Sequence, residues 1–305
     1  VKIPNIPYSG VLDGNIGYIK LNSFTQKAGE EIKTAFLQLK DSSNVKGLIL
    51  DLRGNGGGLL NEAVNIVNIF VKKGEMIVST RGRINERNQI HRTNYNPVDT
   101  GIPLVVLVDR TSASASEIVA GAVQDLDRGV IVGQKTFGKG LVQNIFPLTF
   151  NTRVKITVAK YYIPSGRCVQ KIDYSNKNQN NESEEIPDSL RTAYKTAGGR
   201  TVHDGAGIEP DLLIKSYEYS NISISLVTKH LIFDYATNFT NKIKSIPDIN
   251  SFVINDSIFN DFMVYISDKE YDYVTRSEKS LDELKKHAEQ EKYFDAIVKE
   301  FENLK

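Results

Sequence analysis

Residues 46–71 read KGLILDLRGNGGGLLNEAVNIVNIFV: a short apolar run, then a glycine-rich loop, then a segment with helical periodicity. The run at 46–53 is continuous and short, which is typical of a strand buried on both faces of a parallel sheet. In the segment at 59–71, apolar residues recur three and four positions apart, so it predicts a helix with one apolar face. The stretch therefore predicts a strand–loop–helix unit.

The same order of strand, loop and helix recurs further along the chain. PLVVLVD (103–109) predicts a second buried strand, and a helical pattern follows it at 116–128. GVIVG (129–133) predicts a third strand, and GIEPDLLIKSY (207–217) a last one. Strands that alternate with helices are typical of α/β folds with parallel strands. The predicted fold class is therefore α/β.

Composition and periodicity change along the chain, and these changes suggest how it is divided into regions. Residues 1–12 carry two prolines and are interpreted as the remnant of an upstream region. Residues 13–217 form the predicted core, within which the polar stretch 173–192 lacks periodicity and is expected to be a mobile insertion. Residues 218–305 contain helical patterns with Asp/Glu–Lys pairs, so they predict a helical C-terminal region.

Composition excludes several classes of protein. The 305 residues include 40% hydrophobic and 25% charged residues, which is an ordinary globular composition. The formal net charge of +1 gives no global field to favour nucleic acid or an anionic membrane. No apolar run approaches the ~20 residues that a spanning helix needs. Cys168 is the one cysteine, so neither an intramolecular disulfide nor a cysteine-based zinc site is expected.

Two glycine-rich segments suggest a site for an anion. The loop GNGGG (54–58) precedes a predicted helix, where N–H groups can hold a phosphate or an oxyanion. The dinucleotide fingerprint GxGxxG fails, because Leu59 occupies the place of its third glycine. GQKTFGKG (133–140) matches the GxxxxGK part of a P-loop, but Gly140 stands where Ser or Thr is needed. An NTPase is therefore disfavoured.

Three serines follow the strand at 103–109: Ser112, Ser114 and Ser116. A helix N-terminus beside a serine stabilises an alkoxide or an oxyanion. Serine also caps helices, and we expect Ser116 to do only that.

A nucleophilic serine needs a base, and none of the four histidines lies in a recognisable catalytic or ligand motif. Lys139 lies between two glycines in an apolar stretch, where burial would disfavour the ammonium form. Lys139 is therefore the candidate base.

Four stretches of the sequence, taken together, point to a known family: IGYIKLNSF (16–24), LILDLRGNGGGLL (48–60), DRTSASASEIVAGAVQD (109–125) and VIVGQKTFGKGLVQ (130–143). Together they resemble the C-terminal processing peptidases, or tail-specific proteases, a family of serine endopeptidases with a Ser-Lys dyad. The resemblance covers roughly residues 1–216. In that family the nucleophile precedes the lysine by 25 residues, and a glutamine follows the lysine by four. The resemblance thus implies Ser114, Lys139 and Gln143 as the catalytic residues.

The resemblance also implies a fold, a location and partners. The expected core is a crotonase-like or ClpP-like spiral β-sheet with helices, plus the helical appendage. Family members usually carry a PDZ domain ahead of the core, and we expect it to be missing here, since the chain begins at Val1 with no signal segment. Most act in the bacterial periplasm or cell envelope. Substrates are expected to be C-terminal regions of proteins, bound in extended form, with no cofactor, metal or nucleic acid.

The expected mechanism is acyl transfer. Lys139 takes the proton of Ser114, and the N–H groups of Ala115 and Gly57 hold the oxyanion. The alternative is a catalytically silent peptide-binding or scaffold protein on the same fold. An aspartate eleven residues after the nucleophile, here Asp125, has been proposed as a third catalytic residue in the family. Eleven helical residues span ~16 Å, so we interpret Asp125 as structural and expect it to pair with Arg128.

Overall fold

The structure is a computed structural model of the 305-residue chain. It describes residues 4–177, 183–217, 219–243, 245–246, 251–271, 273 and 275–304. The chain divides into two compact units, residues 1–216 and residues 217–305.

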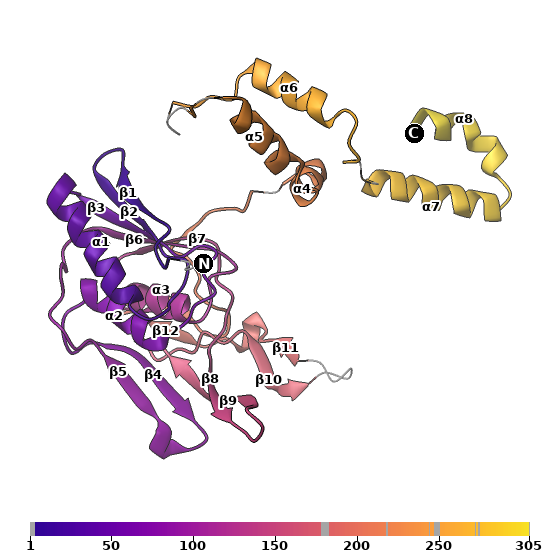
Figure 1. Ribbon diagram of the computed structural model, residues 1–305. Helices are drawn as coiled ribbons and strands as arrows, with labels where there is room; N and C mark the ends of the chain where they lie inside the picture. The colour runs from indigo at the N-terminus through magenta and orange to yellow at the C-terminus, as the bar shows by residue number, and fades with distance from the viewer. Residues whose placement is uncertain are drawn as a thin grey trace. The chain divides into compact units, whose positions relative to one another are not determined.

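A six-stranded sheet forms the centre of the first unit (Figure 1). Its order is β1 (Tyr8–Leu12), β2 (Ile16–Lys20), β3 (Gly47–Asp51), β6 (Leu104–Val108), β7 (Val130–Gly133) and β14 (Leu212–Leu213). Strands β1 and β2 are antiparallel, and every other neighbouring pair is parallel. The α/β class with parallel strands is thus confirmed. Burial alternates along β3 and β6, so one face of these strands is covered less fully than predicted: Ile49, Val105 and Leu107 are only partly buried, while Leu48, Leu50, Leu104, Val106 and Val108 are buried.

Three helices cover this sheet: α1 (Ala28–Ser43), α2 (Leu60–Phe70) and α3 (Ala115–Asp125). Helix α2 packs on both α1 and α3, and the rings of Phe36 and Phe70 lie 5.5 Å apart between α1 and α2. Every residue of α3 is buried, because α3 also packs against β7 and against β4 of a second sheet. The start of α3 is therefore held from several sides.

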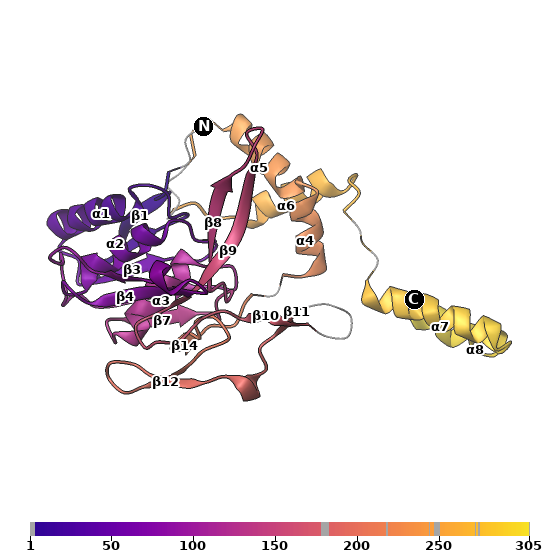
Figure 2. The same cartoon turned by 90° about the horizontal axis from the view of Figure 1, so that it is seen from below.

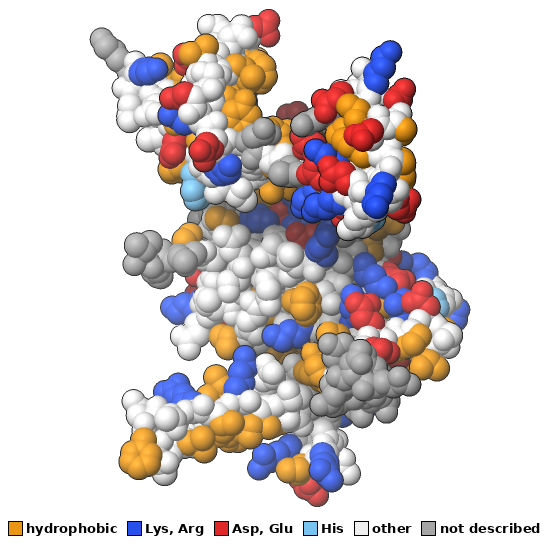
Figure 3. Space-filling view, turned by 90° about the vertical axis from the view of Figure 1, so that its right-hand side faces the viewer, with side chains coloured by type: hydrophobic (Ala, Val, Ile, Leu, Met, Phe, Trp, Pro, Cys, Tyr) orange, Lys and Arg blue, Asp and Glu red, His pale blue; other side chains and the backbone are white. Residues whose placement is uncertain are grey.

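The second sheet is antiparallel, in the order β5 (Gln89–Arg92), β4 (Met76–Gly82), β9 (Arg153–Tyr162) and β8 (Leu141–Pro147). The hairpin of β8 and β9 extends away from the six-stranded sheet (Figure 2). It carries exposed apolar side chains at Ile145, Phe150 and Ile156, and Figure 3 shows a row of hydrophobic side chains on the face turned to the viewer. Strand β8 is an edge strand and begins directly after the loop that contains Lys139.

Two stretches of the first unit contain strands that the sequence pattern did not indicate. In the polar stretch 173–192, which is expected to be a mobile insertion, β10 (Ile172–Lys177) pairs antiparallel with β11 (Ser183–Glu185), and a 3₁₀ turn follows at Asp188–Leu190. Its residues 178–182 lie outside the described residues. Within the proline-bearing N-terminal stretch, β1 joins the central sheet, with Tyr8 opposite Lys20. Smaller elements are the 3₁₀ turn Asn85–Arg87 and the hairpin of β12 (Ala193–Lys195) and β13 (Thr201–His203).

The second unit is helical, as predicted. Its helices are α4 (Asn221–Thr228), α5 (Leu231–Lys242), α6 (Asp256–Ile266), α7 (Arg276–Gln290) and α8 (Phe294–Leu304). Tyr235 of α5 packs its ring against Phe262 and Tyr265 of α6, which joins these two helices. Among the residues that the structure describes, no helix is both long enough and apolar enough to cross a membrane.

Candidate active site

The glycine-rich loop after β3 is fixed by the side chain and the backbone of Asn55. Asn55 is fully buried, and its Nδ2 donates to the carbonyl oxygen of Leu21 at 2.8 Å. Its own carbonyl oxygen accepts from the N–H of Ala113 at 3.0 Å and from Oγ of Ser116 at 2.9 Å. Asn55 therefore fastens the loop both to the end of β2 and to the serine-rich loop after β6.

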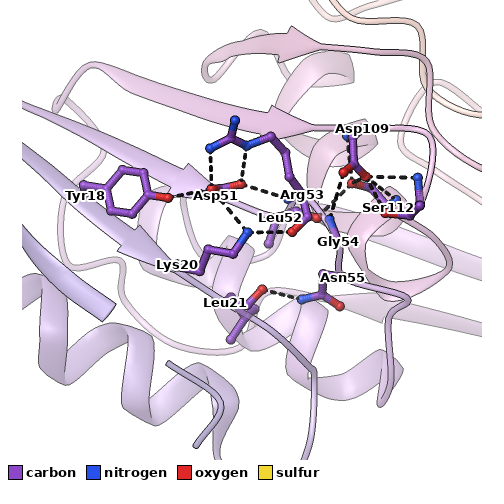
Figure 4. Close-up of polar contacts among 11 residues, drawn as sticks. Tyr18, Lys20, Leu21, Asp51, Leu52, Arg53, Gly54, Asn55, Asp109 and Ser112 are labelled. Atoms are coloured by element: carbon purple, nitrogen blue, oxygen red, sulfur yellow. Dashed lines mark hydrogen bonds and ion pairs between the residues drawn. The ribbon is translucent and has the colours of Figure 1, made fainter. Parts of the chain in front are cut away.

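A buried carboxylate ties the ends of β2 and β3 together beside this loop (Figure 4). Asp51 Oδ2 accepts from the Tyr18 hydroxyl at 2.6 Å, from Arg53 at 2.8 Å and from Lys20 at 3.3 Å. Burial raises the pKa of Asp51, but the hydrogen bonds from Arg53 and Tyr18 and the charge of Lys20 outweigh it and lower that pKa to about 2. Asp51 is therefore ionised and anchors the strand from which the glycine loop leaves.

Asp109 and Ser112 hold the start of the serine-rich loop (Figure 4). Asp109 accepts from the N–H groups of Thr111 and Ser112, both at 3.0 Å, and from the N–H of Gly54 at 3.1 Å. The hydroxyl of Ser112 donates to the carbonyl oxygen of Leu52 at 2.8 Å. The two loops are thus joined at a second place, ahead of Ser114.

The structure separates the three serines by what their hydroxyl groups do. Ser112 and Ser116 are fully buried, and each hydroxyl donates to a backbone carbonyl of the 52–55 stretch. Ser114 is partly exposed, and its hydroxyl donates to no carbonyl of the described residues. The expectation that Ser116 caps the helix is wrong: Ser114 occupies the N-cap position of α3, and Ser116 lies inside the first turn.

Ser114 has a strained backbone. Its φ is 58° and its ψ is −111°, a region that non-glycine residues rarely occupy. It lies on the sharp turn between strand β6 and helix α3, which is the setting of a serine nucleophile in an elbow. Backbone strain of this kind is kept where surrounding contacts enforce it, often at functional sites. The turn presents the Ser114 side chain at the N-terminus of α3, beside the N–H of Ala115.

Glu117, in the first turn of α3, connects Ser114 with the loop that contains Lys139. Its side chain is fully buried. Oε2 accepts from the N–H groups of Ser114 and Lys139, each at 2.8 Å. Oε1 accepts from the Gly138 N–H at 2.7 Å and from the Thr136 hydroxyl at 2.6 Å. Burial raises the pKa of Glu117, while these four hydrogen bonds act to lower it.

Tyr161 of β9 makes a second connection between the same two backbones. Its buried hydroxyl donates to the carbonyl oxygen of Lys139 and lies 3.2 Å from that of Ser114. Burial raises the pKa of Tyr161 well above its usual value, so the hydroxyl keeps its proton. Sequence reasoning missed both Glu117 and Tyr161. An acidic residue three positions after Ser114 is a signal for the first, but Tyr161 has none, because it reads as one apolar residue of a strand.

Gly57 brings the glycine loop against Ser114. Its φ is +99°, and a Cβ atom there would lie 2.6 Å from the carbonyl oxygen of Ala113 and 2.8 Å from Cβ of Ser114. The same atom would lie 2.9 Å from the nitrogen of Ala115. The N–H of Gly57, however, donates to Oδ1 of Asn55 at 2.9 Å. An oxyanion would have to compete with that acceptor for the Gly57 proton.

Lys139 and Gln143 line one cavity of about 780 Å³. Gln143 is exposed on β8, at the point where the pairing of β8 with β9 shifts register. The residues after Gly140 form this strand and not a helix, and the N–H of Gly138 is bound to Glu117. The P-loop-like segment therefore lacks the helix that would complete a phosphate site.

Asp125 lies at the last position of α3, at the end opposite Ser114. Its carboxylate forms a buried ion pair with Arg167 at 2.8 Å and accepts from the N–H of Ser165 at 3.0 Å. The expected pairing with Arg128 is wrong. The Arg128 side chain instead donates to backbone carbonyl oxygens, among them that of Phe70 at 2.8 Å.

The model of peptidase family S41 matches residues 15–176, which is more than half of the chain, so the chain belongs to peptidase family S41. A second model, described as the C-terminal helical domain of a probable PDZ-protease, matches residues 222–305. The S41 match thus covers most of the first unit, and the helical-domain match covers most of the second.

The relatives that the chain resembles are processing proteases. It is 42% identical over 177 residues to a carboxy-terminal-processing protease of Bartonella bacilliformis, covering 56% of this chain and 40% of that protein. It is 39% identical over 166 residues to a chloroplastic C-terminal processing peptidase of Tetradesmus obliquus, covering 54% of this chain and 35% of that protein. The chain thus spans well under half the length of these relatives.

Two solved structures share the fold. The photosystem II D1 C-terminal processing protease matches with a TM-score of 0.52 and 29% identity, over 70% of this chain and 49% of that chain. A putative S41 protease from Bacteroides fragilis matches with a TM-score of 0.51 and 17% identity, over 70% of this chain and 52% of that chain. The second likeness shows the fold alone.

Proposed function

We propose that this chain is a serine endopeptidase that cleaves C-terminal regions of proteins, with Ser114 as nucleophile and Lys139 as general base. The observation that carries the proposal is the conformation of Ser114. It is strained, it stands at the start of a buried helix, and its hydroxyl donates to no carbonyl oxygen of the described residues, whereas the hydroxyls of Ser112 and Ser116 each donate to one. Glu117 and Tyr161 support it, since they hold the backbone of Lys139 beside that of Ser114.

The proposed reaction has two acyl-transfer steps. Neutral Lys139 accepts the proton of Ser114 Oγ, which attacks a peptide carbonyl and forms a tetrahedral intermediate. The N–H of Ala115 and one N–H of the glycine loop, Gly57 in our proposal, hold its oxyanion. The lysine proton then passes to the leaving amine, and water hydrolyses the acyl-enzyme with the same lysine as base. Gln143 would orient Lys139 from across the shared cavity.

Substrate and location are proposed from the relatives. The names of the relatives specify carboxy-terminal processing, and they come from bacteria and from chloroplasts. An extended peptide could add to a free sheet edge such as β8, which would satisfy its backbone groups. We propose a bacterial periplasm or cell envelope as the location. A silent peptide-binding scaffold is the alternative, and no observation favours it over the peptidase.

The test is covalent labelling of Ser114 together with hydrolysis of an unfolded protein. We expect the chain to react with a fluorophosphonate probe, with Ser114 as the labelled residue in the tryptic peptide map, and to hydrolyse casein. Ser114→Ala should lose both activities and keep the melting temperature. Exposed Ser42→Ala, on α1, is the matched control and should keep both. A Ser114→Ala protein that still turns over casein at the wild-type rate would disprove the assignment.

A further inference from the structure

Two cavities merge into one groove beside strand β8. The cavity of about 780 Å³ that contains Lys139 and a second cavity of about 1030 Å³ have several lining residues in common. The shared residues are Leu141, Gln143, Gln170, Ile172 and Tyr174. The groove, called the β8 groove from here on, thus runs between the start of β8 and the start of β10.

The β8 groove is strongly basic. Besides Lys139, the proposed base, the two cavities are lined by six cationic side chains, Arg81, Arg83, Arg110, Lys135, Lys160 and Lys171. Glu185 is the one carboxylate in the lining of the two cavities. The whole chain carries a net charge of only +1, so positive charge is concentrated here. A cleft lined by one sign of charge focuses its field and attracts ligands of the opposite sign.

Most of these cations have no acidic partner within the part of the chain that the structure describes. Lys171 pairs with Glu185 at 2.5 Å, and Lys135 pairs with Glu209, outside the groove lining, at 3.2 Å. The other four, Arg81, Arg83, Arg110 and Lys160, form none of the ion pairs found among the described residues. Arg110 donates to the hydroxyl of Ser216, and Arg81 lies over the ring of Tyr162 at 4.5 Å, so both keep their charge available.

We propose that the β8 groove binds acidic side chains of the substrate on the stretch that flanks the cleaved bond. The proposal rests on the function proposed above and adds a substrate class to it. Lys139 and Gln143 belong both to the groove and to the proposed site, so a peptide bound along the groove passes the proposed base. Leu141 and Ile172 supply apolar wall, which suits a peptide in which acidic and apolar residues alternate.

The test is binding to the uncleaving Ser114→Ala protein, so that it does not depend on catalysis. The probes are two fluorescein-labelled peptides of equal length, one with Glu and Leu alternating and one with each Glu replaced by Gln. In fluorescence anisotropy, we expect the acidic peptide to bind at least about tenfold more tightly at low salt, and the difference to shrink as salt rises. Equal affinities of the two peptides at low salt would overturn the proposal.

A pair of double variants localises the effect. Arg83→Gln with Lys160→Gln removes two groove cations that have no ion-pair partner among the described residues. We expect it to weaken binding of the acidic peptide about threefold to tenfold and to leave the neutral peptide unchanged. Arg153→Gln with Lys155→Gln removes the same charge from exposed positions of β9 outside the groove and should change neither. Equal weakening by both double variants would show a general charge effect and refute the site.

Two further outcomes keep this proposal distinct from the peptidase assignment. The wild-type protein could bind the acidic peptide selectively but neither react with fluorophosphonate nor cleave casein. In that case the peptidase assignment would be wrong, and the proposal that the β8 groove binds acidic peptides would be supported. A single-stranded oligonucleotide that binds more tightly than the acidic peptide, and loses affinity in the Arg83/Lys160 variant, would show that the groove is built for a different polyanion and would overturn the peptide assignment.

Discussion

Ser114 and Lys139 are 25 residues apart in the sequence, yet their backbone N–H groups donate to the same oxygen atom, Oε2 of Glu117, each at 2.8 Å. The two backbones are therefore held side by side whatever their side chains do. A serine and a lysine that must exchange a proton need their Cα atoms fixed relative to each other, because rotamers alone then decide the distance between Oγ and Nζ. The buried carboxylate supplies that constraint.

Lys139→Arg tests whether Lys139 acts as a base or only as a charge. A guanidinium stays protonated at every accessible pH, so it cannot accept the serine proton. We expect casein hydrolysis and fluorophosphonate labelling to fall below detection while the melting temperature stays within about 2 °C, because Lys139 is only half-buried and Arg keeps the positive charge. Lys135→Arg, four residues earlier and lining the same cavity, is the control and should stay active. An active Lys139→Arg enzyme would exclude lysine base catalysis.

Tyr161→Phe tests the second connection between the two backbones. The change keeps the ring and removes the hydroxyl that holds the carbonyl oxygen of Lys139. A shift of ~1 Å in a catalytic group can cost about 10²-fold in rate, so we expect kcat to fall about tenfold to a hundredfold with KM little changed. The neighbouring Tyr162→Phe is the control, since its ring lies over Arg81 and the described residues give its hydroxyl no hydrogen bond. Equal kinetics for the two variants would show that the Tyr161 hydroxyl does not help to position Lys139.

Gly57→Ala and Gly56→Ala form a matched pair in the glycine loop. At Gly57 a methyl group would meet three atoms of the serine loop within 2.9 Å, and the residue has a φ of +99°. At Gly56 nothing lies within 4 Å of the added carbon. We expect Gly57→Ala to lower the labelling rate of Ser114 at least about tenfold through strain and displacement of the serine turn, and Gly56→Ala to label at nearly the wild-type rate. The prediction fails if both variants react alike.

Asp51 predicts a specific dependence of stability on acid. Its pKa is lowered from 3.8 to about 2 in the folded protein, so the folded state binds this proton less readily than the unfolded chain. The resulting stabilisation, about 2 kcal/mol, is complete above pH ~4 and is lost as the pH falls from ~4 towards ~2. We expect the melting temperature of Asp51→Asn to lie below that of the wild type at pH 6, with the gap closing between pH 4 and pH 2. Exposed Asp13→Asn should follow the wild type throughout, and a gap that stays constant with pH would contradict the account.

Much of the first unit could be predicted from the sequence, because its strands and helices have strong and separate periodicities. The strands at 47–51, 104–108 and 130–133 and the helix at 60–70 all lie within a few residues of the expected ranges. Strands β4 and β5 were not predicted. The hairpin β10–β11 was missed because its residues are polar, and its strands form through backbone pairing and not through an apolar pattern.

The candidate site could be predicted only in part. The resemblance to the C-terminal processing peptidases implied Ser114, Lys139 and Gln143, and these assignments remain predictions to be tested. Glu117 and Tyr161 could not be assigned a role, since their contacts join α3 and β9 to a loop that is remote in the sequence. The engagement of the Gly57 N–H with Asn55 depends on a side-chain rotamer, which no sequence pattern encodes.

The backbone of Ser114 has a consequence for how this chain can change. With a φ of 58° and a ψ of −111°, position 114 suits glycine better than any residue with a Cβ atom. A Ser114→Gly exchange would therefore relieve backbone strain and would at the same time remove the hydroxyl that the proposed chemistry requires. Selection for a stable fold would favour glycine at this position, whereas selection for catalysis would favour serine. If serine is retained at this position despite random substitution, the reason would be its role in catalysis and not its contribution to folding.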